Sequence, residues 1–74
     1  MTKDELIFLI DTKKEFEFSY NGKNYNLTYD RSDDGKDLIV FGERFQGKKY
    51  FSFGEFMNDA RIENHYFREM LDDL

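Results

Sequence analysis

The sequence contains no cysteine and no proline, and only five of its 74 residues are glycine. The lack of cysteine excludes disulfides, zinc–thiolate sites and thiol catalysis, and it favours a reducing compartment, so we expect a cytoplasmic protein. Without proline, the turns must be formed by glycine, asparagine and aspartate. The longest apolar run, Leu6 to Ile10, is short and follows two acids, so we expect neither a signal peptide nor a membrane span.

Aromatic residues, by contrast, are abundant: nine Phe and five Tyr make up 19% of the chain. A chain of this length has room for one domain, and we expect residues 1–74 to form it. A domain this small buries a low fraction of its surface, so we expect large aromatic side chains to make up most of its core. The net charge of −5 argues against non-specific binding to nucleic acid or to an anionic membrane.

The first 30 residues predict a helix followed by a β-hairpin. Thr2 and Glu5 form a capping-box pattern before an amphipathic segment, which predicts a helix over residues 3–13. Residues 15–30 then alternate apolar and polar side chains around Asn21-Gly22, the strongest short hairpin signal. Loops of two or four residues at this turn would both keep the apolar side chains of the two strands on one face.

A third strand is expected over residues 37–41, and its register depends on the Asp34-Gly35 turn. A tight turn would place Ile39 and Phe41 on the solvent face, whereas a turn with one more residue would send both into the core. In the first case, large apolar side chains would gather in a surface patch. The candidate interface then comprises Ile39, Phe41, Phe51 and Phe53.

The turn before this strand also contains the nearest approach to a metal-binding motif. Residues 30–35 supply oxygens and a glycine at the spacing of a calcium loop. The match fails at its twelfth position, which is Phe41 where a glutamate is needed, so we expect a simple turn and no metal.

The remaining residues predict a short fourth strand at 48–51 and two helices. Ser52 and Glu55 repeat the capping-box spacing before a helix over residues 53–59. Apolar residues at helical spacing then predict an amphipathic helix over residues 62–73. The expected fold class is α+β, in the order α-β-β-β-β-α-α. An antiparallel three- to four-stranded meander is packed by the N-terminal helix and the two C-terminal helices.

The run from Glu15 to Tyr25, together with the run from Tyr50 to Phe56 and an acidic final helix, resembles a family of small uncharacterised bacterial proteins. The resemblance covers most of the chain, and the motifs that carry it are a hairpin and helix caps. It implies no activity, no cofactor and no functional residues.

Few residues are candidates for catalysis. His65 is the only histidine, and Glu69 would lie one helical turn away, so a minimal enzyme could be built around this pair. A catalytic triad also needs a nucleophile, and none is indicated, so we interpret His65 as a surface residue. Glycine-rich phosphate loops are absent, and we expect no enzyme and no cofactor.

A basic and aromatic segment, with Arg44, Lys48, Lys49 and Tyr50, offers a candidate nucleic-acid surface. Lysines on an edge strand also deter aggregation, and that interpretation is favoured. The sequence thus predicts a non-enzymatic protein-interaction module, a small bacterial or phage regulatory or accessory protein that binds another protein or itself. The alternative is a nucleic-acid-binding domain that uses residues 44–51.

Overall fold

The computed structural model describes residues 1–74 and contains a four-stranded sheet, a small hairpin, two α-helices and two short 3₁₀ helices. The sheet is formed by β1 (Phe16–Tyr20), β2 (Lys23–Arg31), β3 (Asp37–Glu43) and β4 (Lys48–Tyr50). The hairpin is formed by β5 (Arg61–Ile62) and β6 (His65–Tyr66). The helices are α1 (Lys3–Asp11), α2 (Phe53–Asp59) and the 3₁₀ helices Phe67–Glu69 and Leu71–Asp73.

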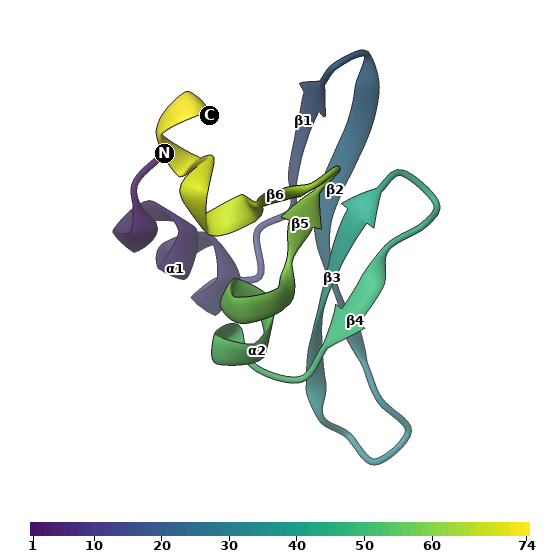
Figure 1. The fold of residues 1–74 in the computed structure, drawn as a ribbon. Coiled ribbons are helices and arrows are strands. Elements are labelled where there is room, and N and C mark those ends of the chain that lie inside the picture. The colour runs from purple at the N-terminus through teal and green to yellow at the C-terminus, as the bar shows by residue number, and fades with distance from the viewer.

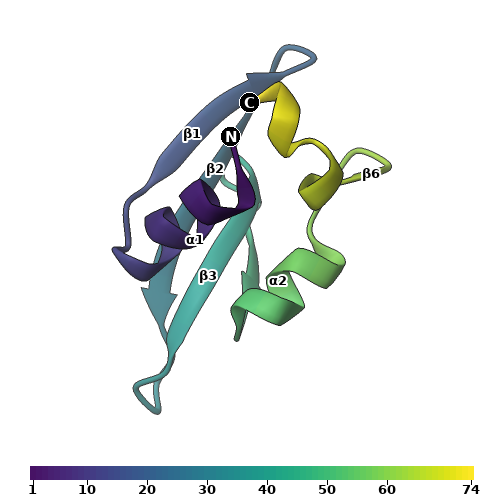
Figure 2. The ribbon, with the colours of Figure 1, turned by 90° about the vertical axis from the view of Figure 1, so that its left-hand side faces the viewer.

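The sheet is antiparallel with the strand order β1-β2-β3-β4, so each strand pairs with its neighbour in sequence. Both α-helices and the C-terminal turns lie on one face of this sheet, and the other face is open (Figures 1 and 2). The predicted α+β class is therefore confirmed, and the meander predicted to have three to four strands has four. None of the helices has the length and apolar character that crossing a membrane requires.

The N-terminal helix and hairpin form where the sequence predicts them. The Thr2 hydroxyl accepts a hydrogen bond from the Glu5 amide, and the Glu5 carboxylate accepts one from the Thr2 amide, which completes the capping box. Asn21 and Gly22 both have positive φ, 51° and 77°, as a two-residue type I′ turn requires. This turn pairs Phe18 with Tyr25, so the two-residue alternative is the one that forms.

The turn between β2 and β3 contains one residue more than a tight Asp34-Gly35 turn. Gly35 adopts φ +87°, and its amide donates to the Ser32 carbonyl, which is the arrangement of a three-residue loop ending in a left-handed glycine. Tyr29 consequently pairs with Ile39, one residue away from the partner that the tight turn predicts. Because side chains alternate along a strand, this single step exchanges the two faces of β3.

The C-terminal segment does not form the α-helix predicted over residues 62–73. Arg61 pairs with Tyr66 and Ile62 with His65, around a two-residue turn in which Glu63 has φ +57°. Two 3₁₀ helices follow. Isoleucine, tyrosine, asparagine and histidine are mediocre helix formers, so local preference does not resist this hairpin. The apolar spacing was nevertheless informative, because the residues it selects are largely buried: Ile62, Phe67, Met70 and Leu71.

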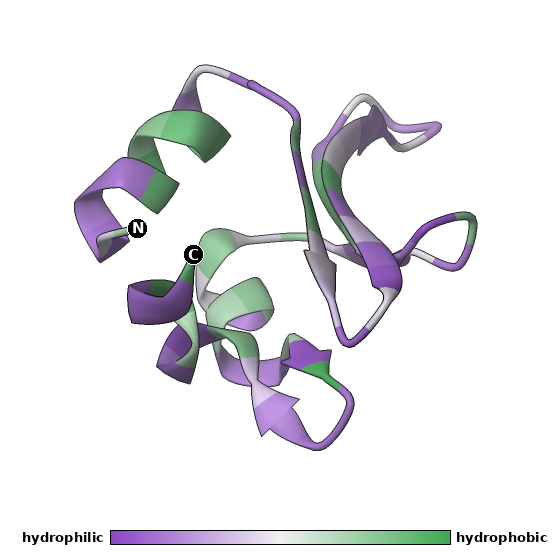
Figure 3. Ribbon diagram, turned by 90° about the horizontal axis from the view of Figure 1, so that it is seen from above, coloured by the Kyte–Doolittle hydropathy of each residue, from purple (hydrophilic) through white to green (hydrophobic).

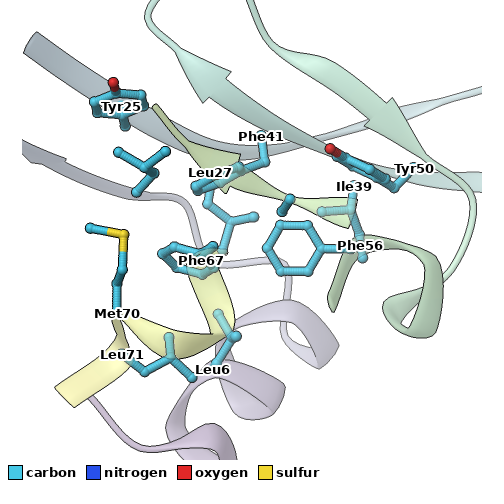
Figure 4. Close-up of a cluster of buried hydrophobic side chains, with 12 residues drawn as sticks. Leu6, Tyr25, Leu27, Ile39, Phe41, Tyr50, Phe56, Phe67, Met70 and Leu71 are labelled. Carbon is cyan, nitrogen blue, oxygen red and sulfur yellow. The ribbon is translucent and has the colours of Figure 1, made fainter. Parts of the chain in front are cut away.

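A cluster of twelve buried side chains lies between the sheet and the helices (Figure 4). Its centre is aromatic: the ring of Phe41 lies 4.6 Å from that of Phe67 and 5.3 Å from that of Phe56, measured between centroids. Leu6 of α1 and Leu27 of β2 are completely buried in the same cluster. The main-chain nitrogen of Met1 also donates to the carbonyls of Leu71 and Leu74, which joins the first residues to the last.

Candidate functional site

The predicted apolar surface patch does not form. Ile39 and Phe41 are only 7% and 2% exposed, because the longer β2–β3 turn rotates both into the core. Phe53 is partly buried and packs against the same core, which leaves Phe51, at 62% exposure, as the one member on the surface. These four residues are therefore not brought together as an interface.

The basic segment is present on the surface, but most of its charge is paired. The Lys48 ammonium lies 2.7 Å from a carboxylate oxygen of Asp59, and that of Lys49 lies 3.2 Å from one of Asp30. Tyr50 is 3% exposed, so its ring is not free to stack on a base. Of the three cations in this set, Arg44 alone forms none of the salt bridges within the chain.

Lys48, Tyr50 and Asp59 form a polar network beside α2. The Tyr50 hydroxyl donates to Asp59 at 3.0 Å, and the same carboxylate oxygen accepts from Lys48. Hydrogen bonds from Lys48 and Tyr50 hold the pKa of Asp59 below its usual value, whereas burial and the nearby carboxylate raise the pKa of Tyr50 to about 12. Neither oxygen exchanges protons near neutral pH, so the network acts as a structural clamp between β4 and α2.

The proposed pair of His65 and Glu69 depended on a C-terminal helix, which is absent. His65 lies in β6 and Glu69 in a 3₁₀ helix, so the one-turn spacing between them no longer applies. Both residues are exposed. Tyr66, the residue next to His65, forms cation–π contacts with two arginines. The guanidinium carbons of Arg61 and Arg68 lie 4.7 Å and 4.4 Å from the centroid of its ring.

A groove between α1 and β1 is a surface feature that the sequence patterns do not identify. We call it the α1–β1 groove; it has a volume of about 490 Å³ and is lined by Met1, Asp4, Glu5, Phe8, Leu9 and Phe16. Four of these six residues are apolar. Phe8 is 56% exposed, which is unusual for so large an apolar side chain.

The carboxylates of Asp4 and Glu5 give the α1–β1 groove an acidic rim. Glu5 is engaged in the capping box, but Asp4 forms none of the salt bridges within the chain. The main-chain nitrogen of Met1, which also lines the groove, donates to the carbonyls of Leu71 and Leu74, and the Lys14 ammonium lies 5.4 Å from the Phe8 ring centroid. The groove can therefore accept an apolar group that carries a positive charge beside it.

The loop between β3 and β4 carries the most exposed aromatic residue of the chain, Phe45, at 91% exposure. The guanidinium carbon of Arg44 lies 5.0 Å from the centroid of its ring. We call these two residues the β3–β4 tip. Sequence reasoning selected Arg44 for its charge but not Phe45. The available signal was an aromatic residue between two glycines, Gly42 and Gly47, that bracket the loop.

The groove is a concave, apolar surface with acids at its rim, whereas the tip is a convex, aromatic and basic one. The ribbon seen from above shows α1 and the β3–β4 loop on opposite sides of the molecule (Figure 3). A search for related proteins found no matching family model, and it found no significant match among curated proteins or solved structures.

Proposed function

We propose that this chain is a non-enzymatic protein-interaction module, and that its binding site is the α1–β1 groove. The observation that carries the proposal is the exposure of Phe8 over a groove that is mostly apolar. Large exposed apolar surfaces on a small domain mark sites of protein interaction. The proposal includes a cytoplasmic location, which the cysteine-free composition supports.

The lining of the groove indicates the kind of group it binds. A large aliphatic or aromatic side chain of a partner would lie against Phe8, Leu9 and Phe16, where it loses contact with water. A neighbouring lysine or arginine of the partner would face Asp4, whose carboxylate has no cation of its own. The preferred ligand is therefore a protein segment with an apolar anchor beside a basic residue.

The alternative of nucleic-acid binding receives less support. It relied on residues 44–51, where Lys48 and Lys49 are paired with acids and Tyr50 is buried. Binding phosphates there would require breaking both ion pairs, and the net charge of −5 would oppose the approach of a polyanion. We therefore retain a protein partner as the proposal.

A selection from a random peptide display library on the immobilised protein tests this proposal. We expect enrichment of peptides that contain an aromatic or large aliphatic residue next to lysine or arginine. These peptides should bind the Phe8→Gln variant at least about tenfold more weakly, since they lose part of an apolar contact. Glutamine is a good helix former, so α1 should remain intact.

The matched control is Phe51→Ser, which removes an exposed aromatic side chain outside the groove. This variant should bind the selected peptides as the unmodified protein does. Amide chemical shifts in α1 and β1 should move on binding. The proposal is wrong if no peptide is enriched, or if enriched peptides bind Phe8→Gln and the unmodified protein equally.

A further inference from the structure

Phe45 is held in a backbone conformation that its side chain disfavours. Its φ is +70°, in the left-handed region where a bulky side chain is a genuine outlier. The ring is almost fully exposed, so burial within the chain does not compensate for this strain. Strained residues of this kind persist where the surrounding structure imposes them, and they gather at functional sites.

Main-chain hydrogen bonds hold the loop around Phe45, although its residues from Arg44 to Gly47 are exposed. The Arg44 amide donates to the Asn24 carbonyl at 2.8 Å, and the Gln46 amide donates to the Glu43 carbonyl at 2.8 Å. A Cβ atom at Gly47 would lie 2.6 Å from a methyl group of Val40, so any larger residue at the base of the loop would have to displace that side chain. These contacts order the backbone of the tip, which lowers the entropy lost on binding.

The chemistry of the tip is complementary to that of the α1–β1 groove. Phe45 provides the apolar anchor, and Arg44 beside it provides a positive charge that forms none of the salt bridges within the chain. The groove provides an apolar floor and the unpaired carboxylate of Asp4. Arginine and aromatic residues, phenylalanine included, are also enriched at protein interfaces.

We infer that the β3–β4 tip of one copy of this chain binds in the α1–β1 groove of a second copy. The Phe45 ring lies among the apolar residues of the groove, and the Arg44 guanidinium faces Asp4 and Glu5. This inference rests on the proposed function, because it names the occupant of the same groove. Since tip and groove lie on opposite sides of the molecule (Figure 3), a chain cannot bind its own tip.

The geometry also determines the kind of assembly. The two contacting surfaces differ, so the contact is heterologous and leaves one free tip and one free groove after each addition. Such contacts build open chains or rings rather than a two-fold dimer. A contact through one loop is smaller than a stable interface, so we expect weak association, on the order of 0.1–1 mM, that weakens further with added salt.

Sedimentation of the full chain at concentrations from about 10 μM to about 1 mM tests the inference, because this range spans the expected dissociation constant. The average mass should rise with concentration. Phe45→Asn should remove this rise, since it deletes the anchor. Asparagine tolerates the left-handed region, so this variant should melt at the same or a higher temperature than the unmodified protein. Phe51→Ser should associate normally.

Mixing two defective variants gives the sharpest test. Phe45→Asn retains a groove, and Phe8→Gln retains a tip, so each should be monomeric alone. Together they should form a one-to-one complex, in which the tip of Phe8→Gln binds in the groove of Phe45→Asn. The complex should grow no further, because the tip and the groove that remain free are the two altered ones.

Any one of three outcomes overturns the inference. The unmodified protein stays monomeric, or Phe45→Asn associates as strongly as the unmodified protein, or the mixture of the two variants stays monomeric. Peptides that still bind the groove under those outcomes would leave the proposed function standing and reject only the second copy as its occupant.

Discussion

The two faces of the four-stranded sheet are built on different principles. The inner face packs aromatic rings against the helices, with Phe18 stacked between Tyr25 and Phe67 at centroid distances of 5.6 Å and 6.0 Å. No helix covers the outer face, and polar side chains on it are exposed to water. One example is the ion pair between Lys49 of β4 and Asp30 of β2, which spans β3.

This difference determines where the free energy of folding resides. Buried apolar contacts on the inner face contribute several kcal/mol per large side chain, whereas exposed ion pairs contribute little. The outer face is not wholly exposed, however, since Leu38, which alternation along β3 places on that face, is only 4% exposed. Substitutions that separate these contributions would test the comparison.

The largest expected effect is that of Phe41→Ser on the inner face. Removing this buried ring should lower the free energy of unfolding by about 3–5 kcal/mol. The whole domain is expected to have on the order of 4–11 kcal/mol at ~0.05–0.15 kcal/mol per residue. The melting temperature, measured by circular dichroism, should therefore fall by at least about 12 °C. Phe51→Ser, which changes an exposed ring, should lie within about 0.5 kcal/mol of the unmodified protein. Equal stabilities of the two variants would refute the assignment of Phe41 to the core.

A smaller effect is expected where the outer face is closely packed, at Gly47. The new methyl group of Gly47→Ala would meet Val40, and the resulting strain should cost about 1–3 kcal/mol in urea unfolding. Gly54→Ala is the matched control, because Gly54 lies in α2 with no atom closer than 4.0 Å to an added Cβ. Alanine stabilises a helix relative to glycine, so the control should be about 0.5 kcal/mol more stable. Destabilisation of both variants alike would show that the packing at Gly47 is not specific.

An effect confined to alkaline pH concerns two tyrosine hydroxyls at the margin of the inner face. Burial is the main cause that raises the pKa of Tyr29 and of Tyr50 to about 12. An unfolded tyrosine has a pKa of about 10, so the stability from these groups is complete below that pH and is lost between about 10 and 12. Urea unfolding at stepwise pH should show this loss, and Tyr50→Phe should reduce it. An unchanged profile in that variant would mean that Tyr50 ionises as it does in the unfolded chain.

Local signals predicted the first half of the fold because each was satisfied by neighbouring residues. The Thr2–Glu5 capping box and the Asn21-Gly22 turn need only the few residues around them, and both form as predicted. Local sequence signals could not determine the β2–β3 register, because Asp-Gly sequences occur in loops of both two and three residues. Gly35 would be left-handed in either loop, and the observed loop differs from a tight type I′ turn because Asp34 does not adopt a positive φ.

Tertiary packing decided the elements and surfaces that the sequence patterns missed. Ile62, Phe67 and Leu71 are buried by the hairpin and 3₁₀ helices as fully as they would be by an α-helix. Apolar spacing alone could not distinguish these structures. The candidate site was missed for a related reason. Phe8 carries no local mark of exposure, and the mark at Phe45 is only the pair of glycines that bracket its loop, whereas aromatic residues in so small a domain are expected to be in its core.

The hydrogen bonds from Met1 to Leu71 and Leu74 have a consequence for the order of folding during synthesis. Phe67, Met70 and Leu71 complete the core that Leu6 of α1 enters. The N-terminal helix therefore lacks part of its packing partners until the last residues of this domain have emerged from the ribosome. We expect the β1–β2 hairpin to form early as a local structure, and stable docking of α1 to wait for the end of translation of this domain.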